Sequence, residues 1–337
     1  MEVLSPFPLF LLSITVLSQI TVISSESILP DLAARIGLNR PSSNFVVENR
    51  AISGFSRHIS INGPFDVIIR LGGSESITLS ALPETLSKIV TDVQENSLDV
   101  HLKDVETNVN SHDEAQIVIT AVSLSKFVLA GTAHVRVDAA VKGEQLSIVL
   151  LNDARMQVVG LEPKETLNIT ITNSAAFQGV INNGKALNLR ASGQAKLILL
   201  GSVEKADLNV QDLAQLNGEN FNAQTIQAAL SGHAVAILHG LGQTDVQIED
   251  FAIGSWLCPD KASVKLAGFA GFNGRGLTVR TAEMSVTEHG QGIFHVEKAA
   301  SGAVADFAAV QIAALKGAAN EVMKTEDGHA TIKWDEL

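Results

Sequence analysis

The sequence predicts an all-β protein that folds as a parallel β-helix, or β-solenoid, with coils of about 18–22 residues. Short runs of alternating apolar residues are separated by Gly, Asn, Asp and Pro, which is the pattern of strands and turns. These runs recur at a nearly constant spacing through the middle of the chain. The apolar content is 46% of 337 residues but only 4% are aromatic, which suits a narrow, layered β core.

The N-terminus has the pattern of a secretory signal peptide. An apolar stretch runs from Phe7 to Ile23 and is followed by small polar residues, although Glu2 stands where such signals usually carry Lys or Arg. This stretch is shorter than the roughly 20 residues of a membrane-spanning helix, and no later segment is long and apolar enough to span. We therefore expect residues 1–24 to be a cleaved signal, with an uncleaved anchor as the alternative.

Residues 25–54 are expected to form a spacer, and the solenoid is expected to begin at Phe55. From there the chain alternates apolar and polar residues, as at Phe65, Val67 and Ile69. The turns between these runs are less evenly spaced than those further along. Residues 55–120 are therefore predicted to form the first, less regular coils.

The main evidence for a solenoid is a repeat of about twenty residues. Five registers begin 21, 20, 21 and 18 residues apart, at Leu146, Leu167, Leu187, Leu208 and Ile226. Each contains alternating apolar positions, a small or polar corner, an alanine, another apolar pair and a glycine. The corner alanines are Ala133, Ala154, Ala175, Ala195, Ala214 and Ala234. Residues 55–240 are predicted to form the main solenoid, and residues 241–337 either further, less regular coils or a second copy of the pattern.

Alternation also predicts which side chains point inward. Successive coils would stack the following residues as an internal ladder: Ile148 and Leu150, Ile169 and Ile171, Leu189 and Ala191. A bend leaves little room for an inward side chain, which accounts for the corner alanine. A β-sandwich is the alternative, since it also has short strands and many turns, but its strands do not normally repeat one corner pattern at one spacing.

One segment carries a resemblance to a known family. Residues 54–102 have a Gly-Phe start, an Ile-x-Ile-x-Gly-x-Phe-x-Val core, an apolar strand after Ser76 and a late Leu-x-Val strand. This resembles the opening of the head GIN domain family, described as putative auto-transporter adhesins, and the likeness continues to about residue 240. The resemblance implies a right-handed, single-stranded β-helix, secretion or surface display, and no catalytic motif. The chain departs from the family by continuing for roughly a hundred further residues.

Charge and motif content exclude several functions. A net charge of −12 without a basic cluster opposes binding to nucleic acid or to an anionic membrane. The sequence has no His-Glu-x-x-His, Gly-x-Ser-x-Gly, P-loop or paired Cys-x-x-Cys motif, so no catalytic residue is assigned. An enzyme assembled from several coils remains the alternative, with its best candidates at corners: Asp153, Arg155, Lys196, Asp212 and His233. Such corner residues are more often simply solvated, and we expect no cofactor.

Two histidine pairs have a spacing that could suggest a metal site. His233 and His239, like His289 and His295, are six residues apart, but a glycine interrupts each pair and a third ligand is missing. The segment Gly240–Asp245 resembles a calcium-binding turn that occurs once, whereas such turns normally repeat. We therefore expect no metal site.

Two short motifs bear on processing and location. Asn168-Ile169-Thr170 is a glycosylation sequon whose asparagine should point outward, opposite Ile169. The final residues Trp334-Asp335-Glu336-Leu337 resemble an endoplasmic-reticulum retrieval signal with tryptophan in place of lysine. The expected location is secreted or at the cell surface, with the endoplasmic-reticulum lumen as a minor alternative.

The predicted function is a non-enzymatic surface or secreted scaffold of adhesin type. Its candidate binding surface is an outward column at the corner, one residue from each of four coils: Thr132, Asp153, Ser174 and Gln194. The expected partner is an extracellular or surface protein or a glycan. A carbohydrate-active β-helix enzyme and a structural envelope or coat component are the alternatives.

Overall fold

The computed structural model describes residues 45–52, 54–55, 57–103, 115–257, 260–314, 319–325 and 329–336. The described chain is almost entirely β-structure and forms a β-solenoid, so the predicted fold class is confirmed and the sandwich alternative is excluded. The predicted signal (1–24) and most of the predicted spacer lie outside the described residues. None of the helices within the described ranges has the length and hydropathy to cross a membrane.

The elements in chain order are β1 (Val46–Arg50), β2 (His58–Asn62), β3 (Phe65–Leu71), β4 (Ser76–Ala81), α3 (Pro83–Leu86), β5 (Ile89–Gln94), β6 (Ser97–Leu102), β7 (Ala115–Ala121), β8 (Lys126–Ala130), β9 (His134–Leu150), β10 (Arg155–Ile171), β11 (Ala176–Ala191), β12 (Lys196–Val210), β13 (Gln215–Leu230), β14 (Val235–Ile248), β15 (Ile253–Leu257), β16 (Lys261–Leu266), β17 (Gly271–Val286), β18 (Gln291–Val304), β19 (Ala309–Ala314), β20 (Ala319–Thr325) and β21 (Thr331–Glu336).

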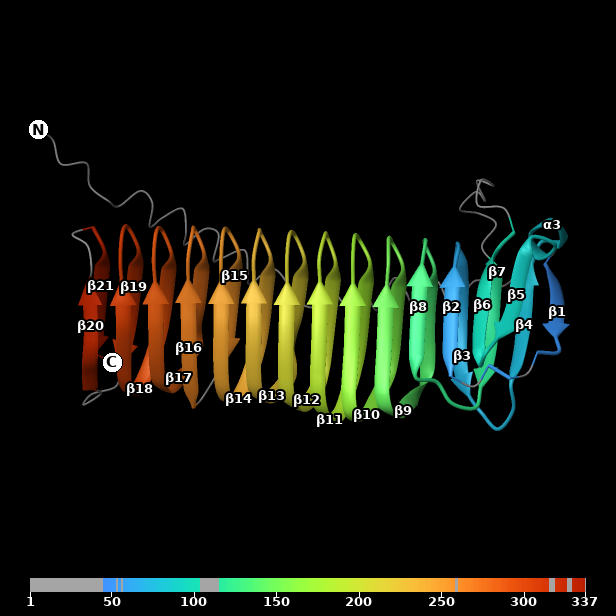
Figure 1. Ribbon diagram of the computed structural model, residues 1–337, viewed down its shortest axis with the longest axis horizontal. Helices are drawn as coiled ribbons and strands as arrows, with labels where there is room; N and C mark the ends of the chain where they lie inside the picture. Colours follow the sequence, from blue (N-terminus) through green and yellow to red (C-terminus); the bar gives the residue numbers. More distant parts are fainter. Residues whose placement is uncertain are drawn as a thin grey trace, which may run out of the picture. The chain divides into compact units, whose positions relative to one another are not determined.

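Each regular coil is one long strand that bends and pairs in parallel with the coils before and after it. β10, for example, pairs in parallel with β9 and with β11. Figure 1 shows these coils side by side, following the sequence from β8 to β21. Residues beyond 240 continue the same sheet, since β14 pairs with β15 and β16, and β18 pairs with β19 and β20.

The core lies inside the coils, where the predicted inward side chains stack. Ile148 pairs in register with Ile169, which in turn pairs with Leu189, and all three are buried. The other predicted members, Leu150, Ile171 and Ala191, form the adjoining buried row. All six corner alanines are 0% exposed, which confirms that these positions face a crowded interior.

Aromatic residues enter the core where glycine leaves room for them. Trp256, Phe272 and Phe294 stack inside successive coils, with centroid separations of 6.0 and 4.9 Å. A Cβ at Gly254, two residues before Trp256 on β15, would lie only 2.1 Å from the indole Cζ3. The glycine therefore provides the volume that the indole occupies.

The first two coils stack in the reverse of their chain order. β2 lies between β6 and β8, and β3 lies between β7 and β9, all in parallel. The coil made by β6 and β7 is therefore outermost, although β2 and β3 precede it in the chain. Residues 55–120 were expected to form the first coils in chain order. Their coils instead stack in reversed order, and part of this segment forms a cap.

Antiparallel strands close this end of the solenoid. β1 pairs with β4, β4 pairs with β7, and β5 pairs with β6, all antiparallel. Figure 1 shows β1, β4, β5 and α3 beyond the parallel coils. Antiparallel strands and a helix cover a parallel edge that would otherwise present unpaired backbone groups. The predicted spacer, residues 25–54, therefore ends earlier than expected, because its residues 46–50 form β1.

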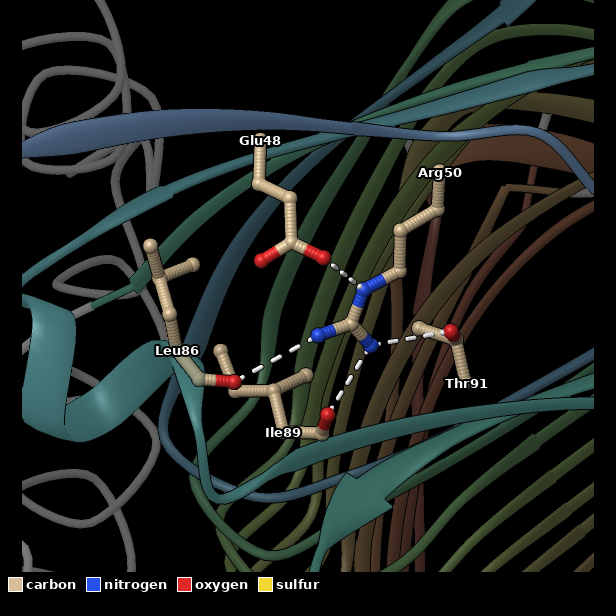
Figure 2. Close-up of polar contacts among 5 residues, drawn as sticks. All are labelled: Glu48, Arg50, Leu86, Ile89 and Thr91. Atoms are coloured by element: carbon tan, nitrogen blue, oxygen red, sulfur yellow. Dashed lines mark hydrogen bonds and ion pairs between the residues drawn. The ribbon is translucent and has the colours of Figure 1, made fainter.

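Hydrogen bonds from Arg50 connect the elements of this cap. Its Nη1 donates to the Ile89 carbonyl and to Thr91 Oγ1, both at 2.9 Å, and its Nη2 donates to the Leu86 carbonyl at 3.4 Å. Its Nε donates to Glu48 Oε1 at 2.8 Å (Figure 2). One guanidinium thus joins β1 to the end of α3 and to β5.

Candidate binding surface

One corner of the solenoid has the same turn in successive coils. In the turn from Leu230 to Ala234, Gly232 has a φ of +72°, His233 points outward and Ala234 is buried. The equivalent left-handed residue is Gly, Asn, Asp or Glu in other coils: Gly131, Asn152, Asn173, Gly193, Asp212, Asp250, Gly268, Glu288 and Asp306. Short polar side chains tolerate this conformation better than other non-glycine residues, which explains most of this composition.

Hydrogen bonds hold the turns in register. The outward residue donates its backbone N–H to the carbonyl of the left-handed residue one coil earlier, as from Phe251 to Gly232 at 2.9 Å. Carboxylates add further bonds, since Asp212 Oδ2 accepts from the Gly193 N–H at 2.9 Å and Asp250 Oδ2 accepts from the Gly232 N–H at 3.0 Å. The outward side chains of neighbouring coils are therefore directly stacked.

We call this outward set the corner column, and it begins with the four predicted residues. Thr132, Asp153, Ser174 and Gln194 are all exposed and occupy equivalent turns, as the repeat predicted. The column does not end there, because each later coil contributes one more exposed residue. These are Leu213, His233, Phe251, Phe269, His289, Phe307 and His329.

The last six members, which we call the aromatic column, form a continuous stack of rings. Successive centroids from His233 to His329 are 5.0, 5.1, 4.6, 5.3 and 4.8 Å apart, and the ring planes lie within 17° of parallel. Phe251, Phe269 and Phe307 are nevertheless 51%, 53% and 58% exposed. Half-exposed phenylalanines arranged in a row are characteristic of interaction surfaces, whereas isolated ones are common on any protein.

Sequence reasoning missed these aromatic residues. An alternating pattern predicts that phenylalanine points inward, so it does not place Phe251, Phe269 and Phe307 on the surface. A signal was present, because each directly precedes a corner alanine: Ala252, Ala270 and Ala308. His329 precedes Ala330 in the same way.

One histidine of each pair that raised the question of a metal is a member of this stack, whereas His239 and His295 lie within β14 and β18. His233 stacks on Phe251, and His289 lies between Phe269 and Phe307. Over the residues that the structure describes, no three His, Cys, Asp or Glu side chains are grouped so that they could hold a metal ion.

The candidate catalytic residues are distributed over separate rows. Asp153 and His233 belong to the corner column, whereas Asp212 is a left-handed residue bonded to a turn amide. Arg155 and Lys196 occupy one register position, with Ala176 of β11 between them. The structure therefore divides the five candidates among three different rows.

A polar hollow lies on a different part of the surface, over β10, β11 and β12. It has a volume of about 560 Å³, and its lining includes the polar residues Asn168, Thr170, Asn188, Arg190, Asp207 and Asn209. Asn168, the predicted glycosylation residue, is exposed here, and its Oδ1 accepts from Asn188 Nδ2 at 2.9 Å.

The C-terminal motif lies partly within a strand. Trp334, Asp335 and Glu336 are in β21, which pairs with β19, while Leu337 falls outside the described residues. Hydrogen bonds from Gln311 Nε2 at 2.9 Å and Lys333 Nζ at 3.0 Å lower the pKa of the Asp335 carboxyl below its ordinary value of 3.8.

Solved structures of other proteins have a similar architecture. No curated protein matches the sequence. The fold is similar to a crystal structure of a putative adhesin from Parabacteroides merdae (TM-score 0.64, 16% identity, 69% of this chain and 96% of that one). It is also similar to one of a putative lipid binding protein from Parabacteroides distasonis (TM-score 0.60, 14% identity, 69% of this chain and 97% of that one).

The sequence itself identifies the family. Residues 56–250 match the family model described as "Putative auto-transporter adhesin, head GIN domain". This confirms the predicted resemblance and covers more than half of the chain. The chain therefore belongs to the head GIN domain family of putative auto-transporter adhesins.

Proposed function

We propose that this protein is a non-enzymatic, adhesin-type scaffold, secreted or displayed at the cell surface, and that it contacts its ligand through the aromatic column. Family membership and the adhesin-like fold neighbours support the general class. The signal-like N-terminus supports export. The residues at the corner support the choice of surface.

The observation that carries this proposal is the change of residue type along the corner column. The turn is the same in coils that carry Thr132, Asp153, Ser174 or Gln194 and in coils that carry Phe251, Phe269 or Phe307. Folding therefore does not require an aromatic residue at this position. Exposed phenylalanines are unfavourable in water, so their concentration in one column favours a role in binding.

The polar hollow supports a second candidate, contact with a glycan. Its lining offers many hydrogen-bond donors and acceptors and only one cation and one anion, Arg190 and Asp207. A neutral, hydroxyl-rich ligand would match this lining. The same residues count against a glycoside hydrolase, because such an enzyme needs two carboxylates and this lining supplies only Asp207.

Proximity labelling on cells that produce the protein tests the main proposal. Labelling should occur outside the cell and recover surface partners with the wild-type chain. The variant Phe251→Ser/Phe269→Ser/Phe307→Ser should lose them. The matched control is Val122→Ser/Val159→Ser/Leu241→Ser, which removes three exposed apolar side chains outside the column. Retention of the chain inside the cell, or identical partners for both variants, would contradict the proposal.

A further inference from the structure

The aromatic column offers ring edges to a ligand, not ring faces. Each ring is stacked on its neighbours at 4.6–5.3 Å, so the faces of the internal rings are covered. Sugars and quaternary ammonium groups bind aromatic residues through an open face. Such ligands would have to separate the stack, and they are poor candidates for this surface.

The ring edges form a narrow apolar ridge. The column has six rungs, and coil spacing of roughly 4.8 Å makes it about 24 Å long. It is one residue wide and projects from a corner of the coil. A rigid partner would need a matching groove, whereas a fluid lipid layer closes around such a ridge without shape complementarity.

The two sides of the ridge differ in polarity. Among the outward positions that follow the column, Val235, Ile253 and Ala309 are half-buried and apolar, whereas Gln291 and Thr331 are polar. The positions that precede it carry carboxylates at Asp250, Glu288 and Asp306. In the other coils of this row, the same position is a glycine, as at Gly232 and Gly268. Apolar side chains thus lie beside part of the ridge on one side, and negative charge lies on the other.

The charges indicate which lipids this ridge would meet. The carboxylates beside the ridge and the net charge of −12 oppose approach to an anionic surface. Carboxylates also resist transfer into hydrocarbon, which limits insertion to the interfacial region. Among lipid surfaces, an electrically neutral one fits both the apolar ridge and its acidic side.

We propose that the aromatic column inserts edge-on into the interface of a neutral lipid layer. This inference rests on the proposed function, since it names the ligand of the same surface. Phe251, Phe269 and Phe307 enter the interface, while the carboxylates remain in water. His289 continues the stack between Phe269 and Phe307, His233 and His329 end it, and all three make the ridge less apolar than a row of phenylalanines.

Co-sedimentation of the full chain with vesicles tests this inference. The wild-type chain should sediment with pure phosphatidylcholine vesicles and less with vesicles that also contain phosphatidylserine. The triple variant Phe251→Ser/Phe269→Ser/Phe307→Ser should lose at least about tenfold in affinity. The control Val122→Ser/Val159→Ser/Leu241→Ser should bind as the wild type does, and His289→Phe should bind more tightly.

A tryptophan probe locates the contact. Phe269→Trp should add a fluorescence component that shifts to shorter wavelength on phosphatidylcholine vesicles, whereas Val159→Trp should add one that does not shift. Absence of wild-type binding to neutral vesicles, or equal loss in both serine variants, would overturn the lipid assignment. A dimer that only the column variant disrupts would overturn it in favour of a second copy of the chain. Either result leaves the proposed function standing if proximity labelling still depends on the column.

Discussion

Phe251 and Phe269 stack at the corners of successive coils with ring centroids 5.1 Å apart and ring planes 1° from parallel. Both side chains are about half exposed, at 51% and 53%. The same chain stacks Phe272 on Phe294 at 4.9 Å inside the coils, where both are buried. One repeat thus produces two aromatic stacks whose contributions to stability should differ.

Replacing one ring in each stack measures this difference. Phe269→Ala should lower the free energy of unfolding by about 1 kcal/mol, the value of lost ring contacts. Phe294→Ala should lower it by about 3–5 kcal/mol, because it leaves a cavity in the core. Urea unfolding of both variants checks the prediction. Equal losses would mean that the exposed column is mainly structural.

Gly254 should be far less tolerant of alanine than Gly271. A Cβ at Gly254 would lie 2.1 Å from Trp256, whereas at Gly271 the nearest atoms belong to Ile253 and are 3.8 Å away. Gly254→Ala should therefore cost about 1–3 kcal/mol through overpacking. Gly271→Ala should change stability by less than about 0.5 kcal/mol or stabilise the fold slightly. Thermal unfolding and tryptophan fluorescence would distinguish the two variants.

Removing Arg50 should loosen the N-terminal cap. Arg50→Ala deletes the hydrogen bonds to the Leu86 and Ile89 carbonyls, and we expect a local loss of about 1.5–3 kcal/mol. Hydrogen exchange should accelerate in β1 and β5 but not in β12. Arg50→Lys should restore only part of the protection, because an ammonium cannot reproduce the guanidinium geometry. Uniform acceleration along the whole solenoid would contradict a local role.

Asp335 should contribute to stability in a pH-dependent way. Its folded-state pKa lies below 3.8, so its contribution is fully present above that value and is lost as the pH falls through the folded pKa. NMR titration should place its midpoint below that of an unfolded aspartate. Gln311→Ala should raise the midpoint, because the hydrogen bond from Gln311 is the largest cause of the lowered pKa. An unchanged midpoint in that variant would contradict the assignment.

Sequence reasoning predicted the solenoid because repetition and alternation are local properties. The buried positions of Ile148, Ile169 and Leu189, the corner alanines and the exposure of Asp153 all follow from a period of about twenty residues combined with a period of two. Stacking in register then follows, because a one-residue shift would expose every inward side chain.

The order of the first coils could not be predicted in this way. Alternation in β2 indicates that Ile59 and Ile61 point inward, but it carries no information on which strands lie on either side. The aromatic column was missed for a related reason. An apolar residue in a β-repeat is usually interior, and only the position of Phe251 relative to Ala252 shows otherwise.

The placement of β2 between β6 and β8 has a consequence for the order of folding. The Ser125 hydroxyl donates to the Arg57 carbonyl across 68 residues, whereas neighbouring regular coils are separated by about twenty. Closing this long loop costs more conformational entropy than adding one coil to the next. The N-terminal coils must also remain open until residues up to about 130 have been synthesised. We therefore expect the capped end to form more slowly than the regular coils, each of which pairs with a neighbour about twenty residues away.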